Sequence, residues 1–393
     1  MPCLGVPAEK NVFAQILARI HPEQFRRCVD RYSGNYKVST FSCWDQFLAM
    51  AFAQITYRQS LADLETCLRS RPDQLYHMGF RSAVAHSTLA DANRNRDWRI
   101  YADLAHGLIA RARPLYQGEP LGIELDQTIY ALDSTTIDLC LTLFPWARFR
   151  STKAAVKLHT LLDIRGPIPA MMTITDGKQA DVTILDELAP EAGAFYVMDR
   201  GYLDFARLYV LHRAGAFFVT RTKAGILLDR LASCPVDRTT GVRSDHIVGL
   251  RTPKSTAHYP ERLRRVAFRV PEDGRVLIFL TNNFVLSAET IARLYKLRWR
   301  VELFFKWIKQ NLRLQHFFGN SENAVKTQVW IAVSVYVLVA LLRKELKLDL
   351  GLSQILQILS VNPFEQVSLN QLVTNLAPRS EPLDHRNQLM LWH

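Results

Sequence analysis

The clearest pattern of hydrophobic and polar positions lies in residues 287–312, SAETIARLYKLRWRVELFFKWIKQNL. Apolar side chains recur there at spacings of three and four residues, which predicts one long helix with a buried face. Ser287 is suited to cap its start, and no Pro or Gly interrupts it. The apolar face comprises Leu294, Leu297, Val301, Phe304, Ile308 and Leu312, and a polar stripe about a quarter turn away comprises Tyr295, Arg298, Glu302 and Lys309.

Residues 1 to about 120 also follow a helical pattern, with predicted helices at 11–21, 40–56, 60–70 and 87–112. The last two are similar to the helices of a helix-turn-helix element. The second begins with a Ser/Thr cap and carries Arg94, Arg96 and Arg99. An Arg- and Asn-rich helix is often only a solvent-exposed face, so direct reading of DNA bases by this segment is the less favoured interpretation.

From Gly122 the pattern changes to short β-rich segments. YALDSTTIDLC, AVKLHTLLDI and PIPAMMTIT predict three strands in series, joined by turns such as 165–167. A helix at 181–188, the strand AFYVMD, a helix at 204–214 and the strand AFFVTR follow. This order predicts an α/β fold.

Residues 221–286 contain the alternating runs HIVGLRT, RRVAFRV and RVLIFLTNN, which predict a β-rich insertion ahead of the long helix. The insertion holds 12 Arg and Lys against 6 Asp and Glu, a net charge of +6 out of +12 for the whole chain. Such clustering suits a surface laid along a phosphate backbone. The alternative is a basic, solvated subdomain without a partner.

The chain after residue 312 is helical again, with helices at 353–359 and 369–376 and a loosely held tail. Its most apolar run, 329–342, has 14 residues, short of the ~20 that span a bilayer, so it predicts a buried helix and no membrane partner. The expected organisation is a helical module at 1–120, an α/β core at 121–345 that contains the 221–286 insertion, and a C-terminal helical region and tail at 346–393.

Composition narrows the class of protein. A pI near 9.5 predicts a polyanionic partner, although ribosomal or membrane-surface roles also fit the charge. The six cysteines form no C-x-x-C pair, which argues against a zinc site and a disulfide framework and suits a reducing cytoplasm. The N-terminus lacks the pattern of a secretion signal, so we expect a cytoplasmic, nucleoid-associated protein.

Two aspartates follow apolar runs in the predicted core: Asp133 ends TIYALD and Asp199 ends AFYVMD. A carboxylate beside a buried strand is costly unless a cation meets it, although one alone is more often a cap or turn residue. Glu302 follows Asp199 by 103 residues, and its spacing from Arg298 also fits a simple surface ion pair. Three converging carboxylates would favour Mg²⁺ or Mn²⁺.

The order Tyr295, Arg298, Glu302, Lys309 resembles the Tyr-Arg-Glu-Lys signature of the IS-four-type family of bacterial insertion-sequence transposases. The segments ALDST, KLHTLLD, VMDRGY and YKLRWRVELFFKWIK carry the resemblance over most of the chain. It implies a ribonuclease-H-like catalytic core interrupted by the β-rich insertion, with helical N-terminal and C-terminal regions. The N-terminal module would support binding of double-stranded DNA at the terminal repeats.

The resemblance also implies roles for individual residues. Asp133, Asp199 and Glu302 would form an Asp-Asp-Glu triad that holds two Mg²⁺ or Mn²⁺ ions about 3.5–4 Å apart for in-line displacement at phosphorus. Asp133 would bridge both ions. The residues expected to contact DNA phosphates are Tyr295, Arg298, Lys309, Arg264 and Arg265, and Arg200 would either contact DNA or neutralise the carboxylates. His159 is expected to be a core or supporting residue more than a metal ligand.

As a transposase, the chain would cut at the terminal inverted repeats of its element and join the 3′ ends to target DNA, working as a homodimer because two ends are paired. Relatives with such an insertion are thought to pass through a DNA hairpin and stack a flipped base on an aromatic side chain. None of the seven Trp residues lies in 221–286, so the candidates there are Tyr259, Phe268, Phe279 and Phe284. The alternatives are a structure-selective nuclease with the same fold and a DNA-binding protein with a decayed triad.

Overall fold

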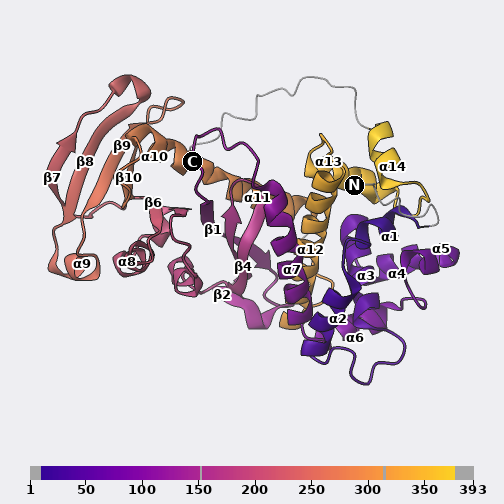
Figure 1. Ribbon diagram of the computed structural model, residues 1–393. Helices are drawn as coiled ribbons and strands as arrows, with labels where there is room; N and C mark the ends of the chain where they lie inside the picture. Colours follow the sequence, from indigo (N-terminus) through magenta and orange to yellow (C-terminus); the bar gives the residue numbers. More distant parts are fainter. Residues whose placement is uncertain (1–9, 151–152, 313–315, 377–393) are drawn as a thin grey trace. The chain divides into compact units, whose positions relative to one another are not determined.

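The computed structural model describes residues 10–150, 153–312 and 316–376 of the chain (Figure 1). Within these ranges the chain forms two compact units, each built from separate segments. The first unit comprises residues up to 116, then 137–156, then the chain from 305 onward. The second comprises 117–136 and 157–304.

The first unit is almost entirely helical, as the apolar spacing predicts. The predicted helix at 87–112 is two helices, and two further helices begin at prolines, Pro22 and Pro72, where the sequence analysis placed none. Its helices are α1 (Val12–Leu17), α2 (Pro22–Arg31), α3 (Cys43–Ile55), α4 (Leu61–Arg69), α5 (Pro72–Met78), α6 (His86–Asn95), α7 (Arg99–Tyr116), α12 (Glu322–Glu345), α13 (Leu352–Val361) and α14 (Leu369–Leu376). A short 3₁₀ helix (Pro145–Ala147) and strand β2 (Arg148–Arg150) also belong to it.

Helix α12 is the centre of the first unit and packs against α7, α3 and α6 (Figure 1). It has 24 residues, longer than the predicted apolar run, and by length and composition alone it could cross a membrane. Its most apolar window is, however, 94% buried inside the structure. It is therefore packed as the core helix of a globular unit.

The predicted Ser/Thr cap of the α6 segment is not found, because Ala85 precedes the helix and no side chain caps it. Arg96 follows α6 and donates to the carbonyl oxygens of Phe41 and Ser42 and to Gln46. Arg99 pairs with Asp97 at 2.5 Å. Arg96 is thus engaged within the helical unit, whereas Arg99 forms its ion pair on the exposed surface.

The second unit is built on a sheet with the strand order β2-β3-β1-β5-β6-β10-β9-β8-β7, in which β4 also pairs with β3. Strands β1, β5 and β6 are parallel to one another. The pairs β6–β10, β10–β9, β9–β8 and β8–β7 are antiparallel. The strands are β1 (Ile129–Leu139), β3 (Lys153–Asp163), β4 (Ile168–Asp176), β5 (Phe195–Met198), β6 (Phe217–Arg221), β7 (Leu228–Cys234), β8 (Val242–Leu250), β9 (Leu263–Arg269) and β10 (Val276–Thr281). Strands β1 and β3 extend from this unit into the first one.

Residues 221–286 are mostly β, as predicted, but they do not form a sheet of their own. Strand β10 pairs with β6 from Phe279↔Arg221 to Thr281↔Val219, so the segment extends the core sheet outward. We call strands β7–β10, with the short helix α9 (Pro253–His258) and a 3₁₀ turn (Arg238–Thr240), the sheet extension.

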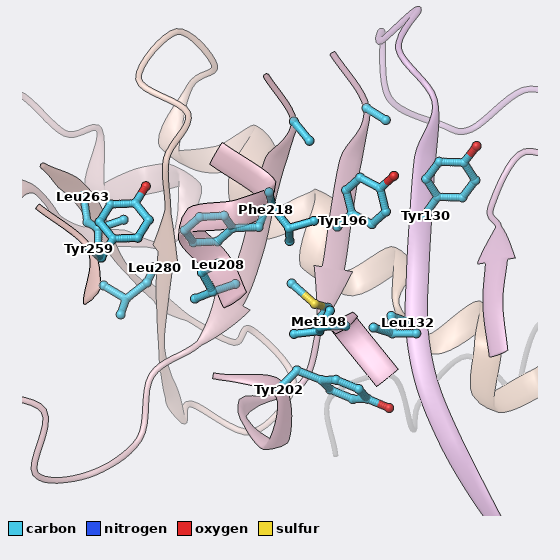
Figure 2. Packing of buried hydrophobic residues seen from close by; sticks show 14 of the residues in the cluster. Tyr130, Leu132, Tyr196, Met198, Tyr202, Leu208, Phe218, Tyr259, Leu263 and Leu280 are labelled. Carbon is cyan, nitrogen blue, oxygen red and sulfur yellow. The ribbon is translucent and has the colours of Figure 1, made fainter. Parts of the chain in front are cut away.

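A single apolar cluster lies against the parallel strands (Figure 2). Tyr130, Tyr196 and Phe218 are register partners on β1, β5 and β6, so their rings lie in one row. Leu132 and Met198 form the next row towards the strand ends. This face is covered by α8 (Phe205–Arg213) and by the 3₁₀ helices η2 (Asp181–Glu187) and η3 (Arg200–Tyr202), where the sequence predicted an α-helix at 181–188.

The predicted single helix at 287–312 is two helices, α10 (Ala288–Leu297) and α11 (Trp299–Asn311), with α11 passing into the first unit. The Ser287 cap is confirmed, since its hydroxyl accepts from the Thr290 amide. At the junction the Arg298 amide donates to the Tyr295 carbonyl and the Val301 amide to the Arg298 carbonyl, both at 3.1 Å. These three-residue hydrogen bonds tighten the helix locally. As a result Arg298 is buried, whereas Leu297 is only half-buried.

Candidate active site

The two predicted aspartates lie next to register partners on neighbouring parallel strands. Leu132 of β1 is paired with Met198 of β5, and Asp133 and Asp199 are the residues that follow them. Strand β1 continues past Asp133, while β5 ends and Asp199 precedes η3. The Thr220 hydroxyl of β6 donates to the Asp199 carbonyl at 3.2 Å. The sheet therefore holds the two backbones close together.

Arg298, at the α10–α11 junction, connects Asp133 with Glu302. Its Nη1 donates to Asp133 Oδ2 at 2.7 Å, and its Nη2 donates to Glu302 Oε1 at 2.5 Å. The residue is only 6% exposed. The interpretation of Arg298 and Glu302 as a solvated surface pair is therefore wrong, because the guanidinium is buried and also bound to a carboxylate on the sheet.

Tyr295, one turn earlier on α10, reaches the other aspartate. Its hydroxyl donates to Asp199 Oδ1 at 3.4 Å, and its ring packs against Phe279 of β10 with centroids 4.8 Å apart. The Arg298 guanidinium lies 5.7 Å from the centre of the same ring. Two side chains at one helix junction thus connect three carboxylates that are far apart in the sequence.

The electrostatics of this group follow from its burial. Burial raises the pKa of Asp133 to about 6; Arg298 and the Ser134 amide oppose that rise, and the negative charges of Glu302 and Asp199 add to it. Burial alone would lower the pKa of Arg298, but Tyr295, Asp133 and Glu302 hold it above its ordinary value, so the guanidinium stays charged. Burial raises the pKa of Tyr295 to about 12, which keeps its hydroxyl a donor.

The remaining predicted phosphate contacts have different surroundings. Arg200 is exposed directly after Asp199, and no ion pair of its side chain occurs among the described residues. Lys309 belongs to the first unit, where burial lowers its pKa and Asp138 opposes that shift. Arg265 of β9 is partly buried, and burial lowers its pKa as well.

The expectation that Arg264 contacts DNA is wrong in this structure. Its side chain is 6% exposed and forms a two-pronged ion pair with Asp245 of β8, Nε to Oδ1 at 2.9 Å and Nη2 to Oδ2 at 2.6 Å. Its Nη1 donates to the Leu286 carbonyl at 2.5 Å, just before α10. All three guanidinium nitrogens therefore serve to hold the sheet extension against the start of α10.

His159 is fully buried on β3, as expected of a core residue. Its Nε2 is 2.9 Å from the Thr175 hydroxyl of β4, and its Nδ1 is 3.9 Å from Asp181 Oδ1. Asp181, which begins η2, is not among the site residues that the sequence predicts. No local pattern distinguishes it from an ordinary acidic residue in the first turn of a helix.

Of the four aromatic candidates in the sheet extension, three are core residues. Tyr259, Phe268 and Phe279 are buried, whereas Phe284 in the loop between β10 and α10 is 45% exposed. Phe284 lines a cavity of about 510 Å³ together with Val242, Ile247 and Leu286.

The three carboxylates match the expected divalent cation in donor chemistry, because carboxylate oxygens are the ligands that Mg²⁺ and Mn²⁺ prefer. Across the described ranges, no three His, Cys, Asp or Glu side chains lie close enough together to hold an ion as placed. Arg298 explains the spacing, since its guanidinium spans Asp133 and Glu302 and supplies the positive charge. Burial raises the pKa of Asp133, and the negative charges of Glu302 and Asp199 raise it further. A divalent cation bound to the carboxylates would favour the ionised form against both effects.

Two family models match the chain. Residues 124–338 match the family model described as Transposase DDE domain, and residues 8–81 match a domain of unknown function, DUF4372.

Three curated proteins are similar to the chain. The chain is 34% identical to "Putative transposase y4zB" of Sinorhizobium fredii over 64% of its own length and 69% of that protein. It is 33% identical to "Probable transposase for insertion sequence element IS5377" of Geobacillus stearothermophilus, over 59% and 61% of the two chains. It is 27% identical to "Putative transposase for insertion sequence element IS4SA" of Synechocystis, over 81% and 88%. Because the matched segment covers more than half of the chain and contains the carboxylate site, the chain belongs to the transposase DDE domain family.

Proposed function

We propose that the chain is the transposase of an insertion sequence, which cuts DNA at the terminal inverted repeats and joins the 3′ ends to target DNA. Asp133, Asp199 and Glu302 are its catalytic carboxylates. The observation that carries this proposal is the junction of α10 and α11, where Tyr295 and Arg298 connect all three.

The sheet supports a ribonuclease-H-like catalytic core. In the order β3-β1-β5-β6, the last three strands are parallel. Asp133 lies within β1, and Asp199 directly follows β5. Helix α10 packs on β5 and β6 and carries Tyr295, the first residue of the Tyr-Arg-Glu stretch. Carboxylates that lie side by side on neighbouring parallel strands and meet one helix junction suit a phosphoryl-transfer site.

Asp133, Asp199 and Glu302 would hold two Mg²⁺ or Mn²⁺ ions, which would activate the attacking water or hydroxyl and stabilise the leaving 3′ oxygen. Two other side chains of the chain offset the negative charge of these carboxylates. Arg298 compensates Asp133 and Glu302, and Tyr295 donates to Asp199. When Arg298 releases the carboxylates, both of its Nη groups become free to bind a DNA phosphate bidentately.

The sheet extension suits the DNA path on one face only. Arg265 of β9 is the register partner of His246 on β8. Burial lowers the pKa of His246, and the positive charges of Arg265 and Arg230 lower it further. These three side chains therefore lie together. Arg264 points to the opposite face, because side chains alternate along a strand. Lys309 and Arg200 are further phosphate contacts in this proposal, and a homodimer would pair the two ends.

A hairpin intermediate is part of the proposal, and Phe284 is the side chain best suited to stack on a flipped base. It is the one exposed aromatic among the four candidates. It lies two residues before Leu286, whose carbonyl accepts a hydrogen bond from Arg264 just ahead of α10. Base stacking on an exposed aromatic contributes about 1–3 kcal/mol.

The test is Mg²⁺-dependent nicking and strand transfer on a duplex that ends in the terminal repeat. Glu302→Gln should lower the nicking rate at least about 100-fold, because it removes one of three charges from the site. Glu289→Gln is the matched control, since Glu289 is an exposed residue of α10 that faces Arg293 at 3.9 Å. Equal nicking by wild type and Glu302→Gln would refute the assignment of Glu302.

Strand transfer separates this proposal from its alternatives. A pre-cut end with a free 3′ hydroxyl should be joined to target DNA by the wild type. Hydrolysis without joining would indicate a nuclease with the same fold. Binding of the repeat without any cleavage would indicate a DNA-binding protein whose triad is inactive.

A further inference from the structure

A fourth carboxylate, Asp181, lies beside the proposed catalytic group. It is the first residue of η2, and its Oδ1 accepts a hydrogen bond from the Ser134 hydroxyl at 2.8 Å. The same oxygen is 3.0 Å from Lys157 Nζ on β3. Lys157 also donates to the Gln179 carbonyl at 2.8 Å, which fixes the ammonium group in place.

Ser134 is the residue after Asp133 and contacts it directly. The Ser134 amide donates to Asp133 Oδ1 at 2.8 Å, while Arg298 binds the other oxygen, Oδ2. A continuous series of contacts therefore runs from Lys157 through Asp181 and Ser134 to Asp133. Each oxygen of the Asp133 carboxylate has its own donor, and one of these donors belongs to the residue that Asp181 holds.

The surroundings of Asp181 are polar and largely buried. Fully buried His159 approaches Asp181 Oδ1 with its Nδ1 at 3.9 Å. The Tyr202 side chain is 2% exposed, and its hydroxyl has no hydrogen-bond partner within the described part of the chain. Burial raises the pKa of Tyr202, and the charges of Asp133 and Asp181 raise it further, so the phenol lies near both carboxylates.

We propose that Asp181 is a positioning residue for the transposase reaction: it holds Ser134 and thereby orients the carboxylate of Asp133. The inference rests on the proposed function, in which Asp133 holds the divalent ions. Residues that orient a metal-binding carboxylate through a hydrogen bond strongly affect metal affinity, typically by about 10- to 100-fold. Asp181 is suited to this role because Lys157 compensates its charge.

The alternative is that Asp181 only stabilises the first turn of η2. Both roles predict a loss of stability on substitution, so stability alone does not separate them. Asp186 provides a matched control, because it lies on the same 3₁₀ helix and binds Arg207 at 2.7 Å on the exposed side. Removing Asp186 alters η2 without touching Ser134.

The experiment measures Mn²⁺ affinity by calorimetry on the full chain, together with the Mg²⁺ concentration at half-maximal nicking. Asp181→Ala should weaken Mn²⁺ binding and raise the Mg²⁺ midpoint by about 10- to 100-fold, while Asp186→Ala leaves both unchanged. Asp181→Asn retains an oxygen acceptor for the Ser134 hydroxyl and should recover most of the loss. Ser134→Ala should produce a similar loss, and the double variant Ser134→Ala/Asp181→Ala should be no worse than either single variant.

Two results would overturn the proposal: an unchanged Mn²⁺ affinity in folded Asp181→Ala, or losses from Ser134→Ala and Asp181→Ala that multiply in the double variant. Calorimetry does not require cleavage. If the wild type binds Mn²⁺ but cuts no DNA, the proposed function fails while the role of Asp181 is still decided. If Asp181→Ala does not fold, Asp181→Asn and Ser134→Ala carry the test.

Discussion

At the scale of single residues, the proposed site depends on one buried cation, because Arg298 binds both Asp133 and Glu302. The spacing of Tyr295, Arg298 and Glu302 is visible in one helix, but the bond from Arg298 to Asp133 joins residues 165 positions apart. The same limit explains the error at Arg264. A basic residue in a basic segment suggests DNA binding, and only the pairing of β8 with β9 reveals that Asp245 lies beside it.

Replacing Arg298 by Met tests its role as the internal cation. Breaking a buried ion pair from one side costs about 3–5 kcal/mol, because the remaining charges lose their partner. We therefore expect Arg298→Met to lower the free energy of unfolding by that order in EDTA, with part of the loss recovered when Mg²⁺ is added. Urea unfolding in both buffers measures this.

Arg293→Met is the control for that substitution, because Arg293 is an exposed residue of α10 whose contacts are a 3.9 Å approach to Glu289 and a hydrogen bond to the Gly122 carbonyl. It should change the unfolding free energy little in either buffer. A loss in Arg298→Met that Mg²⁺ leaves untouched would mean that the guanidinium does not stand in for a cation.

At the scale of elements, periodicity predicted the strands of the core well, since β1, β3, β4, β5 and β6 all lie where the β-rich segments were placed. It failed where tertiary contacts decide the outcome. Nothing in the local sequence requires the helix to tighten at Arg298, because no Pro or Gly stands there. At the break, the Arg298 side chain lies between Asp133 of β1 and Glu302 of α11, and these two carboxylates compensate its positive charge.

The burial of His159 in strand β3 predicts a pH dependence of stability. Burial lowers its pKa, with Lys157 acting in the same direction and Asp181 opposing, so the unfolded chain takes up a proton at higher pH than the folded chain does. The stability that neutral His159 contributes is present above the unfolded value of about 6.5 and is lost as the pH falls below it.

We expect the wild type to lose more unfolding free energy between pH 7.5 and pH 5.5 than His159→Gln does, as measured by urea titration at both pH values. His77→Gln, in an exposed position on α5, should behave like the wild type. Parallel losses in wild type and His159→Gln would show that His159 is not the group responsible.

At the scale of the whole molecule, the sequence predicts the amount of positive charge in the sheet extension but not the face of the sheet on which each basic side chain lies. The excess of basic residues in 221–286 is a property of the sequence, whereas the face on which each lies depends on strand register. Composition also could not reveal that β1, β3 and α11 each belong to both compact units, because such sharing depends on contacts between distant segments.

The salt dependence of DNA binding tests whether the face that carries Arg230 and Arg265 contacts DNA. Arg230→Ala with Arg265→Ala should weaken binding and reduce the log–log salt slope by up to about 2, since each lost phosphate contact removes roughly one unit. Arg264→Ala should instead destabilise the fold and leave the slope of the folded protein unchanged. An unchanged slope in the Arg230/Arg265 variant would remove that face from the DNA path.

The pairing of β6 with β10 has one more consequence. The chain leaves the core at Arg221 and returns through residues that are hydrogen-bonded to the same strand, so the departure and return points of the sheet extension are neighbours. The hairpin of β7 and β8 can therefore change in length without shifting the helix that carries Tyr295, provided that Arg264 and Asp245 keep the extension attached at Leu286. Homologues are therefore expected to differ most in hairpin length at β7 and β8, and least in this shared pair of strands.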